Sequence, residues 1–330
     1  MTTLTSPHDL LAAIPFLIGY HPQDSLVLVA LKDEAVGMAM RVDMPVGVSA
    51  EGYDLLASHF LRDGADGAFI VAYVGAGEVD PENVLINTSA ALVRAGIDIK
   101  ESLIVRNNRF RSMICSDLTC CPPEGSAIPD LGSSRIAAEH VIAGHPMPFE
   151  NEDGLVQSIA ALPSSFESVW ADEVQAFWVS SDSEEIQELQ RDGATAIIDL
   201  VGEYREGRGA EDRELAARVI GRLSDIQVRD FALGSHTDES ADYYWAMWRD
   251  LLRIAPRGFV APIACLFAAM AYERGEGALA HKGLDRGLGD DDQYSLAHLL
   301  RRVFTAGWPP QSFSAMRIEL HPKVVAAIFG

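Results

Sequence analysis

The sequence predicts an α/β N-terminal domain with a mixed sheet, followed by an all-α domain. Three observations support this prediction. Helix-like and strand-like stretches alternate through the first third of the chain, an order typical of a sheet with flanking helices. The strand signal fades after Cys115, where apolar residues instead recur at helical spacing. The chain has 330 residues, which favours two domains over a single core, and we expect them at 1–146 and 147–330.

The first domain is expected to contain two β-hairpins and flanking helices. The predicted elements are, in order, a helix at 7–17, strands at 25–33 and 37–45, a helix at 49–64, a strand at 67–74, a helix at 81–96, and strands at 99–106 and 109–115. Asp80 and Pro81 favour a helix start, because aspartate caps free amides and proline needs no amide partner there. The dipeptide Asn107-Asn108 tolerates positive φ and so predicts the second hairpin turn.

The second domain is predicted to be helical throughout. Before it, the first domain ends with a capped helix at 133–144, which is followed by "HPMPFENEDG" (145–154), whose composition is typical of a linker. Long helical stretches follow at 182–204 and 212–223. Three later segments carry small residues at their helix contacts, and these are 262–277, 278–289 and 294–307. They look like tetratricopeptide-type helix pairs without a strict period, and an ordinary helical bundle is the alternative.

The charge balance argues against nucleic acid and membrane partners. The formal net charge is −22, and a surface of that sign repels phosphate backbones and anionic lipid. Between Glu150 and Glu203 thirteen acidic residues stand against one basic residue, Arg191. This acidic segment can meet a basic partner, hold divalent cations loosely, or simply be solvated.

The chain is expected to be cytoplasmic. Its first residues lack the basic start of a signal peptide. The longest apolar run, 259–272, falls short of the roughly 20 residues that a membrane span needs. In the cytoplasm thiols stay reduced, so clustered cysteines there more often bind metal or react than form disulfides.

The segment "CSDLTCCPPEG", which begins at Cys115, contains three closely spaced cysteines. The Cys-x₂-Cys spacing of zinc knuckles is missing, and two adjacent cysteines are expected to point apart rather than to bind one ion. A four-ligand zinc site can still be assembled, with the candidate ligands Cys115, Cys120 or Cys121, His140 and His145. Zinc is the one metal that the pattern suggests, and no cofactor is predicted.

The same cysteines have three other interpretations. The first is a redox pair between Cys115 and one of the two later cysteines. The second is a reactive thiol, whose lowered pKa would need positive charge from Arg106, Arg109 or Arg111. In the third, the prolines fix a tight turn and the small thiols fill space.

Polar residues at the predicted strand ends form a second candidate site, because α/β domains often bind ligands there. His21, Asp24 and Ser25 include the residue types of a hydrolytic triad, but a triad requires converging geometry and the sequence has no Gly-x-Ser-x-Gly elbow. Alternatively, Asp24 or Ser25 binds the backbone amides of the turn. Arg41 and Asp43 face one side of a strand, where they form an ion pair or frame a polar pocket. The complete set of pocket candidates is His21, Asp24, Ser25, Arg41, Asp43, Arg106 and Arg109.

The segment "YVGAGEVDPE" has the first two glycines of a dinucleotide-binding fingerprint, Gly75 and Gly77. The third glycine position holds Asp80. An acidic helix cap occupies the amides that a pyrophosphate would use and repels it, so we interpret this motif as false.

Several segments resemble a family of actinobacterial proteins, the domain of unknown function 4192. They are "LLAAIPFLIGYHPQDSLVLVAL", "RVDMP", "RFRSMICSDLTCCPPEG", "QVRDFAL", "WRDLLRIAP" and "RGEGALAHKGLDRGLGDDDQYSLAHLL". The resemblance covers nearly the whole chain, but the family carries no assigned activity, so it implies no catalytic role.

Two functions are compatible with these observations. The first is a protein-interaction or regulatory module, in which the helical domain binds a protein partner. The alternative is an enzyme or small-molecule binder with its pocket in the α/β domain. The sequence contains no recognisable catalytic motif, so the choice between an enzyme and a binding protein stays open.

Overall fold

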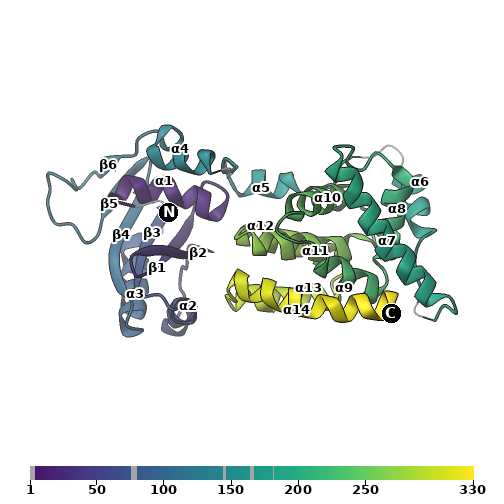
Figure 1. Ribbon diagram of the computed structural model, residues 1–330. Helices are drawn as coiled ribbons and strands as arrows, with labels where there is room; N and C mark the ends of the chain where they lie inside the picture. Colours follow the sequence, from purple (N-terminus) through teal and green to yellow (C-terminus); the bar gives the residue numbers. More distant parts are fainter. Residues whose placement is uncertain (1–3, 76–79, 144–145, 164–166, 181) are drawn as a thin grey trace. The chain divides into compact units, whose positions relative to one another are not determined.

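The computed structural model describes residues 4–75, 80–143, 146–163, 167–180 and 182–330. The chain divides into two compact units, Met1–Leu155 and Val156–Gly330. The first unit contains a mixed sheet with flanking helices and the second is helical, which confirms the predicted fold class (Figure 1).

The first unit is built on a six-stranded mixed sheet. Its strands are β1 (Ser25–Lys32), β2 (Ala35–Asp43), β3 (Gly67–Val74), β4 (Asp98–Arg106), β5 (Arg109–Ser112) and β6 (Ser126–Ala127). They lie in the order β2-β1-β3-β4-β5-β6. β3 and β4 pair in parallel, and the other neighbours pair antiparallel. Both predicted hairpins, β1–β2 and β4–β5, are confirmed.

Four helices of the first unit precede, separate or follow these strands in the sequence. They are α1 (Pro7–Ile18), α2 (Ala50–Asp63), α3 (Pro81–Arg94) and α4 (Arg135–Ile142). Leu28 of β1 shares one hydrophobic core with Phe60 of α2 and Leu92 of α3. Val27 and Val29 point the opposite way on β1 and are also fully buried, so the strand is covered on both faces. α1 packs against β2 and α4.

Local signals set the ends of these elements as predicted. Asp80 Oδ1 accepts the backbone amides of Glu82 (3.1 Å) and Asn83 (3.2 Å) at the start of α3. Asn107 and Asn108 have φ values of 51° and 57°, which a type I′ hairpin turn requires.

The segment predicted as a linker is partly paired with the first unit. The amide of Phe149 donates to the carbonyl of Gly19 (2.9 Å), and the carbonyl of Phe149 accepts from the amide of His21 (3.0 Å). α5 (Glu152–Ser158) follows directly. Composition indicates that such a segment is exposed, but it carries no information about backbone pairing with a distant turn.

The second unit packs its helices around α11. The helices are α6 (Glu167–Gln175), α7 (Ile186–Arg205), α8 (Arg213–Arg222), α9 (Ile226–Gly234), α10 (Ala241–Ile254), α11 (Val260–Glu273), α12 (Gly277–Asp290), α13 (Ser295–Thr305) and α14 (Pro310–Phe329). α11 is buried along almost its whole length and contacts α9, α10, α12, α13 and α14. α12 comes close because its residues are small: a Cβ on Gly287 would lie 2.9 Å from the Cβ of Ala264.

The tetratricopeptide-like pairing stays a prediction. Within the described residues, none of the helices is long and apolar enough to span a membrane.

A buried ionic network attaches α14 to the helical core. Arg317 is 5% exposed, and its guanidinium donates to both carboxylate oxygens of Glu273, at 2.7 and 3.1 Å. It also donates to the carbonyls of Gly234 and His236, each at 3.1 Å. His236 Nε2 lies 3.1 Å from Glu273 Oε2. Burial alone would raise the pKa of Glu273, but the hydrogen bonds from His236 and Arg317 hold that pKa below its usual value.

Candidate metal centre

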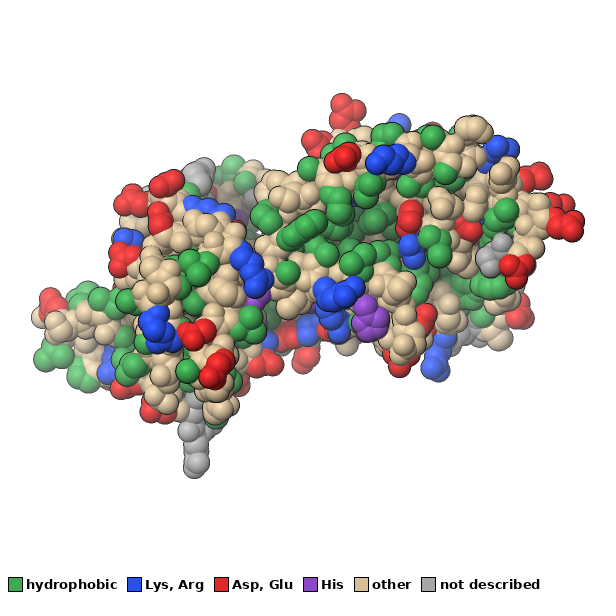
Figure 2. Space-filling model, turned by 90° about the horizontal axis from the view of Figure 1, so that it is seen from below, with side chains coloured by type: hydrophobic (Ala, Val, Ile, Leu, Met, Phe, Trp, Pro, Cys, Tyr) green, Lys and Arg blue, Asp and Glu red, His purple; other side chains and the backbone are tan. Residues whose placement is uncertain are grey.

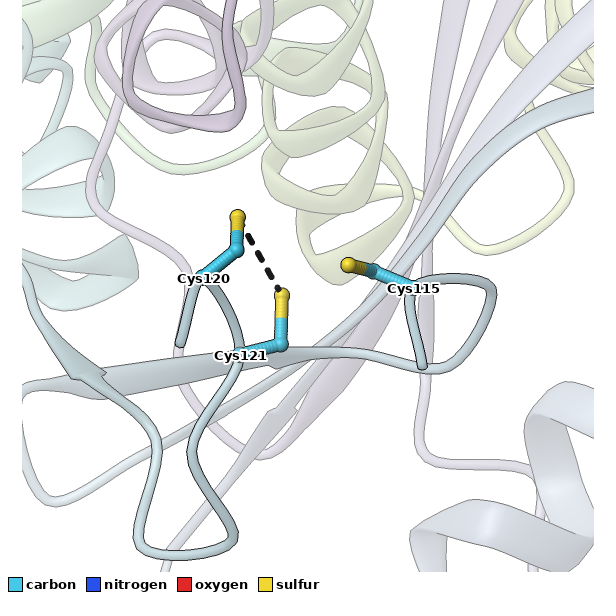
Figure 3. A group of neighbouring side chains, drawn as sticks. All are labelled: Cys115, Cys120 and Cys121. Atoms are coloured by element: carbon cyan, nitrogen blue, oxygen red, sulfur yellow. Dashed lines mark hydrogen bonds between the residues drawn. The ribbon is translucent and has the colours of Figure 1, made fainter. Parts of the chain in front are cut away.

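The cysteine loop, residues 113–125, follows β5 and brings three thiols together. The Sγ atoms of Cys115, Cys120 and Cys121 all lie within 4.8 Å of one another. Cys120 Sγ and Cys121 Sγ are 3.9 Å apart (Figure 3). Among the described residues, these three thiols form the cluster whose sulfur atoms could bind a metal ion.

A serine at the end of β5 positions the first thiol. Ser112 Oγ accepts the backbone amides of Ile114 (3.2 Å) and Cys115 (3.1 Å). It donates to Oε1 of Glu101 on β4 at 2.7 Å. The start of the loop is therefore bonded to the sheet through the side chains of Ser112 and Glu101, a contact that the sequence did not predict.

The other two thiols are placed by a tight turn. The amide of Cys121 donates to the carbonyl of Asp117 at 2.7 Å, and Asp117 Oδ1 accepts the amide of Thr119 at 2.8 Å. This single helical turn curls the chain, so Cys120 and Cys121 do not point apart as we expected for neighbours. The signal available in the sequence was the Asp117-x-Thr119 pattern, which is typical of an Asx turn.

The far end of the loop is held by Arg109. Its Nε donates to the carbonyls of Glu124 (2.9 Å) and Gly125 (3.0 Å), and one Nη donates to Gly125 at 2.6 Å. Gly125 has a φ of 77°, and a Cβ there would lie 2.8 Å from the carbonyl oxygen of Phe110. Glycine is therefore required at position 125. The Arg109 side chain binds the loop backbone, so it does not line a separate pocket.

The spacing of the thiols is compatible with coordination of a thiophilic metal. Four ligands at the usual Zn–S distance of ~2.3 Å place neighbouring sulfur atoms of a tetrahedron ~3.8 Å apart. The 3.9 Å separation of Cys120 and Cys121 is close to this value. The remaining thiol pairs need only small side-chain rotations, because all lie within 4.8 Å.

The thiols differ in exposure. Cys115 and Cys120 are exposed, and Cys121 is half-buried. Burial raises the pKa of the Cys121 thiol to about 11, and its hydrogen bonds with the thiols of Cys115 and Cys120 act in the same direction. The fourth cysteine, Cys265, is buried in α11 and is separate from this loop. Burial also raises the pKa of its thiol to about 12.

The two predicted histidine ligands are not part of the described group. His140 lies on α4, where its ring stacks on Phe16 with a centroid distance of 4.5 Å. It does not belong to the cluster of three thiols. His145 lies outside the described residues.

His21, Asp24 and Ser25, near the start of β1, do not form a catalytic triad. Asp24 Oδ1 accepts the amide of Gly75 at 2.6 Å, so its carboxylate is used to bind the backbone at the end of β3. Ser25 is fully buried, and its Oγ has no hydrogen-bond partner in the part of the chain that the structure describes. His21 is exposed. Asp24 also occupies the Gly75 amide, which supports our interpretation of the dinucleotide fingerprint as false; Gly77 lies outside the described residues.

The remaining pocket candidates divide between two parts of the sheet. Arg41 Nη1 pairs with Asp43 Oδ1 at 2.6 Å, and Arg41 Nη2 lies 3.4 Å from Glu152. Arg106 is exposed at the end of β4, next to Arg109 across the hairpin. β2 and β5 are four strand spacings apart in the sheet order, which corresponds to about 19 Å. The structure therefore does not bring Arg41 and Arg109 into one pocket.

A family model described as domain of unknown function (DUF4192) matches residues 7–311. The chain belongs to this family. In this DUF4192 chain the match runs from the first residue of α1 to the start of α14 and includes the cysteine loop. The comparisons with curated proteins and with solved structures give no match.

Proposed function

We propose that this chain is a metal-binding regulatory module, in which the cysteine loop binds one zinc ion through three thiolates. The observation that carries the proposal is the convergence of three Sγ atoms within 4.8 Å. Thiolate ligands select soft or borderline metals such as zinc over magnesium or calcium. The proposal places the protein in the cytoplasm, where such thiols stay reduced.

A regulatory role fits the charge of the site better than hydrolysis does. Three thiolates outweigh the two positive charges of zinc, and so weaken its action as a Lewis acid on a bound water. The cluster within the described residues contains no histidine or carboxylate that would serve as a general base. The fourth coordination position is left for water or for a ligand from outside the loop.

The first test is the metal content of the full chain. We expect about one zinc per chain in protein purified under reducing conditions without chelator, measured by elemental mass spectrometry. Cys115→Ser should lose most of this zinc because it removes one of three thiolates. Cys265→Ala is the matched control, since Cys265 lies in α11, and it should keep the metal. Equal zinc in both variants would contradict the proposal.

Binding of a protein partner by the helical unit is the second candidate function. α14 exposes three large apolar side chains, Ile318 (59%), Leu320 (45%) and Phe329 (44%). Hydrophobic side chains gather on the face of this unit that Figure 2 shows, the face on which α13 and α14 lie in Figure 1. Exposed apolar groups of this kind are typical of interaction surfaces.

Charged substitutions on the exposed surface of α14 are expected to abolish binding of a protein partner. The double variant Ile318→Glu and Phe329→Glu, whose positions share one side of α14, should lose a protein that the wild type retains in affinity purification from the native host. Ile86→Glu is the control, because Ile86 is equally exposed (59%) but lies on α3, in the first unit. If both variants retain the same proteins as the wild type, α14 is not the binding surface.

A further inference from the structure

We propose that the cysteine loop is also a peroxide-sensitive switch, in which oxidation joins Cys115 to Cys121 and ejects the metal. The release of metal rests on the proposed function, whereas the formation of the disulfide does not. The inference is carried by the arrangement of the thiols, by their exposure and by the way the loop is attached.

The arrangement selects one pair of thiols. The Cys121 thiol interacts with the thiols of both Cys115 and Cys120, and Figure 3 shows the contact with Cys120 as a dashed line. A disulfide needs its sulfur atoms ~2.05 Å apart, and the thiols of Cys115 and Cys121 start within 4.8 Å. A bond between the adjacent Cys120 and Cys121 would close a small ring around a planar peptide bond, which opposes it. Cys115 and Cys121 are therefore the expected pair.

The loop is accessible and can rearrange. Cys115 and Cys120 are exposed to solvent, so a small oxidant reaches them. Leu118, between them, is 70% exposed and is not packed into the core. The bonds that hold the loop are made to its backbone, by Ser112 to the amide of Cys115, by Ser126 to the carbonyl of Cys120 and by Arg109 to the carbonyl of Gly125. The thiols can move together without disturbing the sheet.

The chemistry balances with hydrogen peroxide as the oxidant. The Cys115 thiolate attacks one peroxide oxygen, the O–O bond breaks, and protonation of the departing hydroxide gives water and a sulfenic acid. The Cys121 thiolate then attacks the sulfenic sulfur, the S–O bond breaks, and a second water leaves. Two thiolates have lost two electrons, and the peroxide has been reduced to two waters with uptake of two protons. Because the metal has lost two of its three ligands, it dissociates.

The experiment uses the full chain, both metal-free and loaded with one equivalent of zinc. Hydrogen peroxide is added, released zinc is followed with a chromophoric chelator, and thiols are counted after denaturation. We expect release of one zinc per chain and a fall from four thiols to two. Peptide mass spectrometry should show Cys115 linked to Cys121, and dithiothreitol with added zinc should reverse both changes.

Variants separate the switch from general damage. Cys120→Ser keeps the reacting pair and should still form the disulfide, whereas Cys121→Ser should not. Cys265→Ala should respond like the wild type. Circular dichroism on each variant confirms that it is folded before it is oxidised.

The outcomes distinguish the two proposals. If zinc binds but four thiols and the zinc survive peroxide, or if zinc leaves with only sulfinic acid formed, the switch is overturned. If no zinc binds but the metal-free chain forms the Cys115–Cys121 disulfide, the proposed function fails and the redox pair is upheld.

Discussion

Replacing Arg317 by methionine is expected to lower the free energy of unfolding by about 3–5 kcal/mol, because it leaves the carboxylate of Glu273 buried without its cation. Methionine keeps much of the side-chain volume, so the loss reports on the ion pair rather than on a cavity. The carbonyls of Gly234 and His236 lose their donor as well. Urea unfolding at pH 7, followed by circular dichroism, measures the effect.

The matched control for this variant is Arg301→Met. Arg301 also pairs with a carboxylate, that of Asp285, but both side chains are more than a third exposed. Exposed ion pairs contribute less than about 1 kcal/mol, so this variant should unfold close to the wild type. Equal losses in the two variants would contradict the view that the network of Glu273 stabilises the helical unit.

The same network predicts a direction for pH dependence. The pKa of Glu273 is lower in the folded chain than its usual value, so the unfolded chain binds the proton more tightly. The stability contributed by this group is present above the unfolded pKa and is lost as pH falls through the folded pKa. The gap in stability between wild type and Arg317→Met should therefore narrow as the solution is acidified.

The second large effect is expected at the metal site. Cys121→Ser should weaken zinc binding by more than a hundredfold, because it removes a ligand, and loss of an outer hydrogen-bond partner already costs 10–100-fold. Ser112→Ala tests that smaller effect, since it frees the amides of Ile114 and Cys115 but keeps every thiol. Competition with a chromophoric chelator gives both affinities.

The order of these effects is the informative result. We expect wild type and Cys265→Ala to bind most tightly, Ser112→Ala to be intermediate and Cys121→Ser to be weakest. If Cys121→Ser binds zinc as tightly as the wild type, the metal is held elsewhere in the chain.

The parts of the fold that follow from neighbouring residues were predictable. Asp80 and Pro81 define the start of α3, and Asn107-Asn108 defines a hairpin turn, because a cap or a turn depends on a few adjacent backbone groups. The same reasoning gave the positions of the strands and the helical character of the second unit.

The candidate site was predictable only in part, because its geometry depends on contacts between distant residues. The cysteines were singled out from the sequence, but their convergence depends on the carbonyl of Asp117 and on the relay from Glu101 to Ser112. Likewise, His140 is close to the cysteines in sequence, yet its ring packs on Phe16 of α1. Spacing in a sequence cannot show which partner a side chain meets across a fold.

X-ray absorption at the zinc edge, on the full chain loaded with one equivalent of zinc, tests directly whether the three thiolates bind the metal. We predict three sulfur neighbours at ~2.3 Å and one lighter atom in the fourth position. A first shell made of nitrogen and oxygen alone would contradict this prediction, because the metal would then be bound without the cysteine loop.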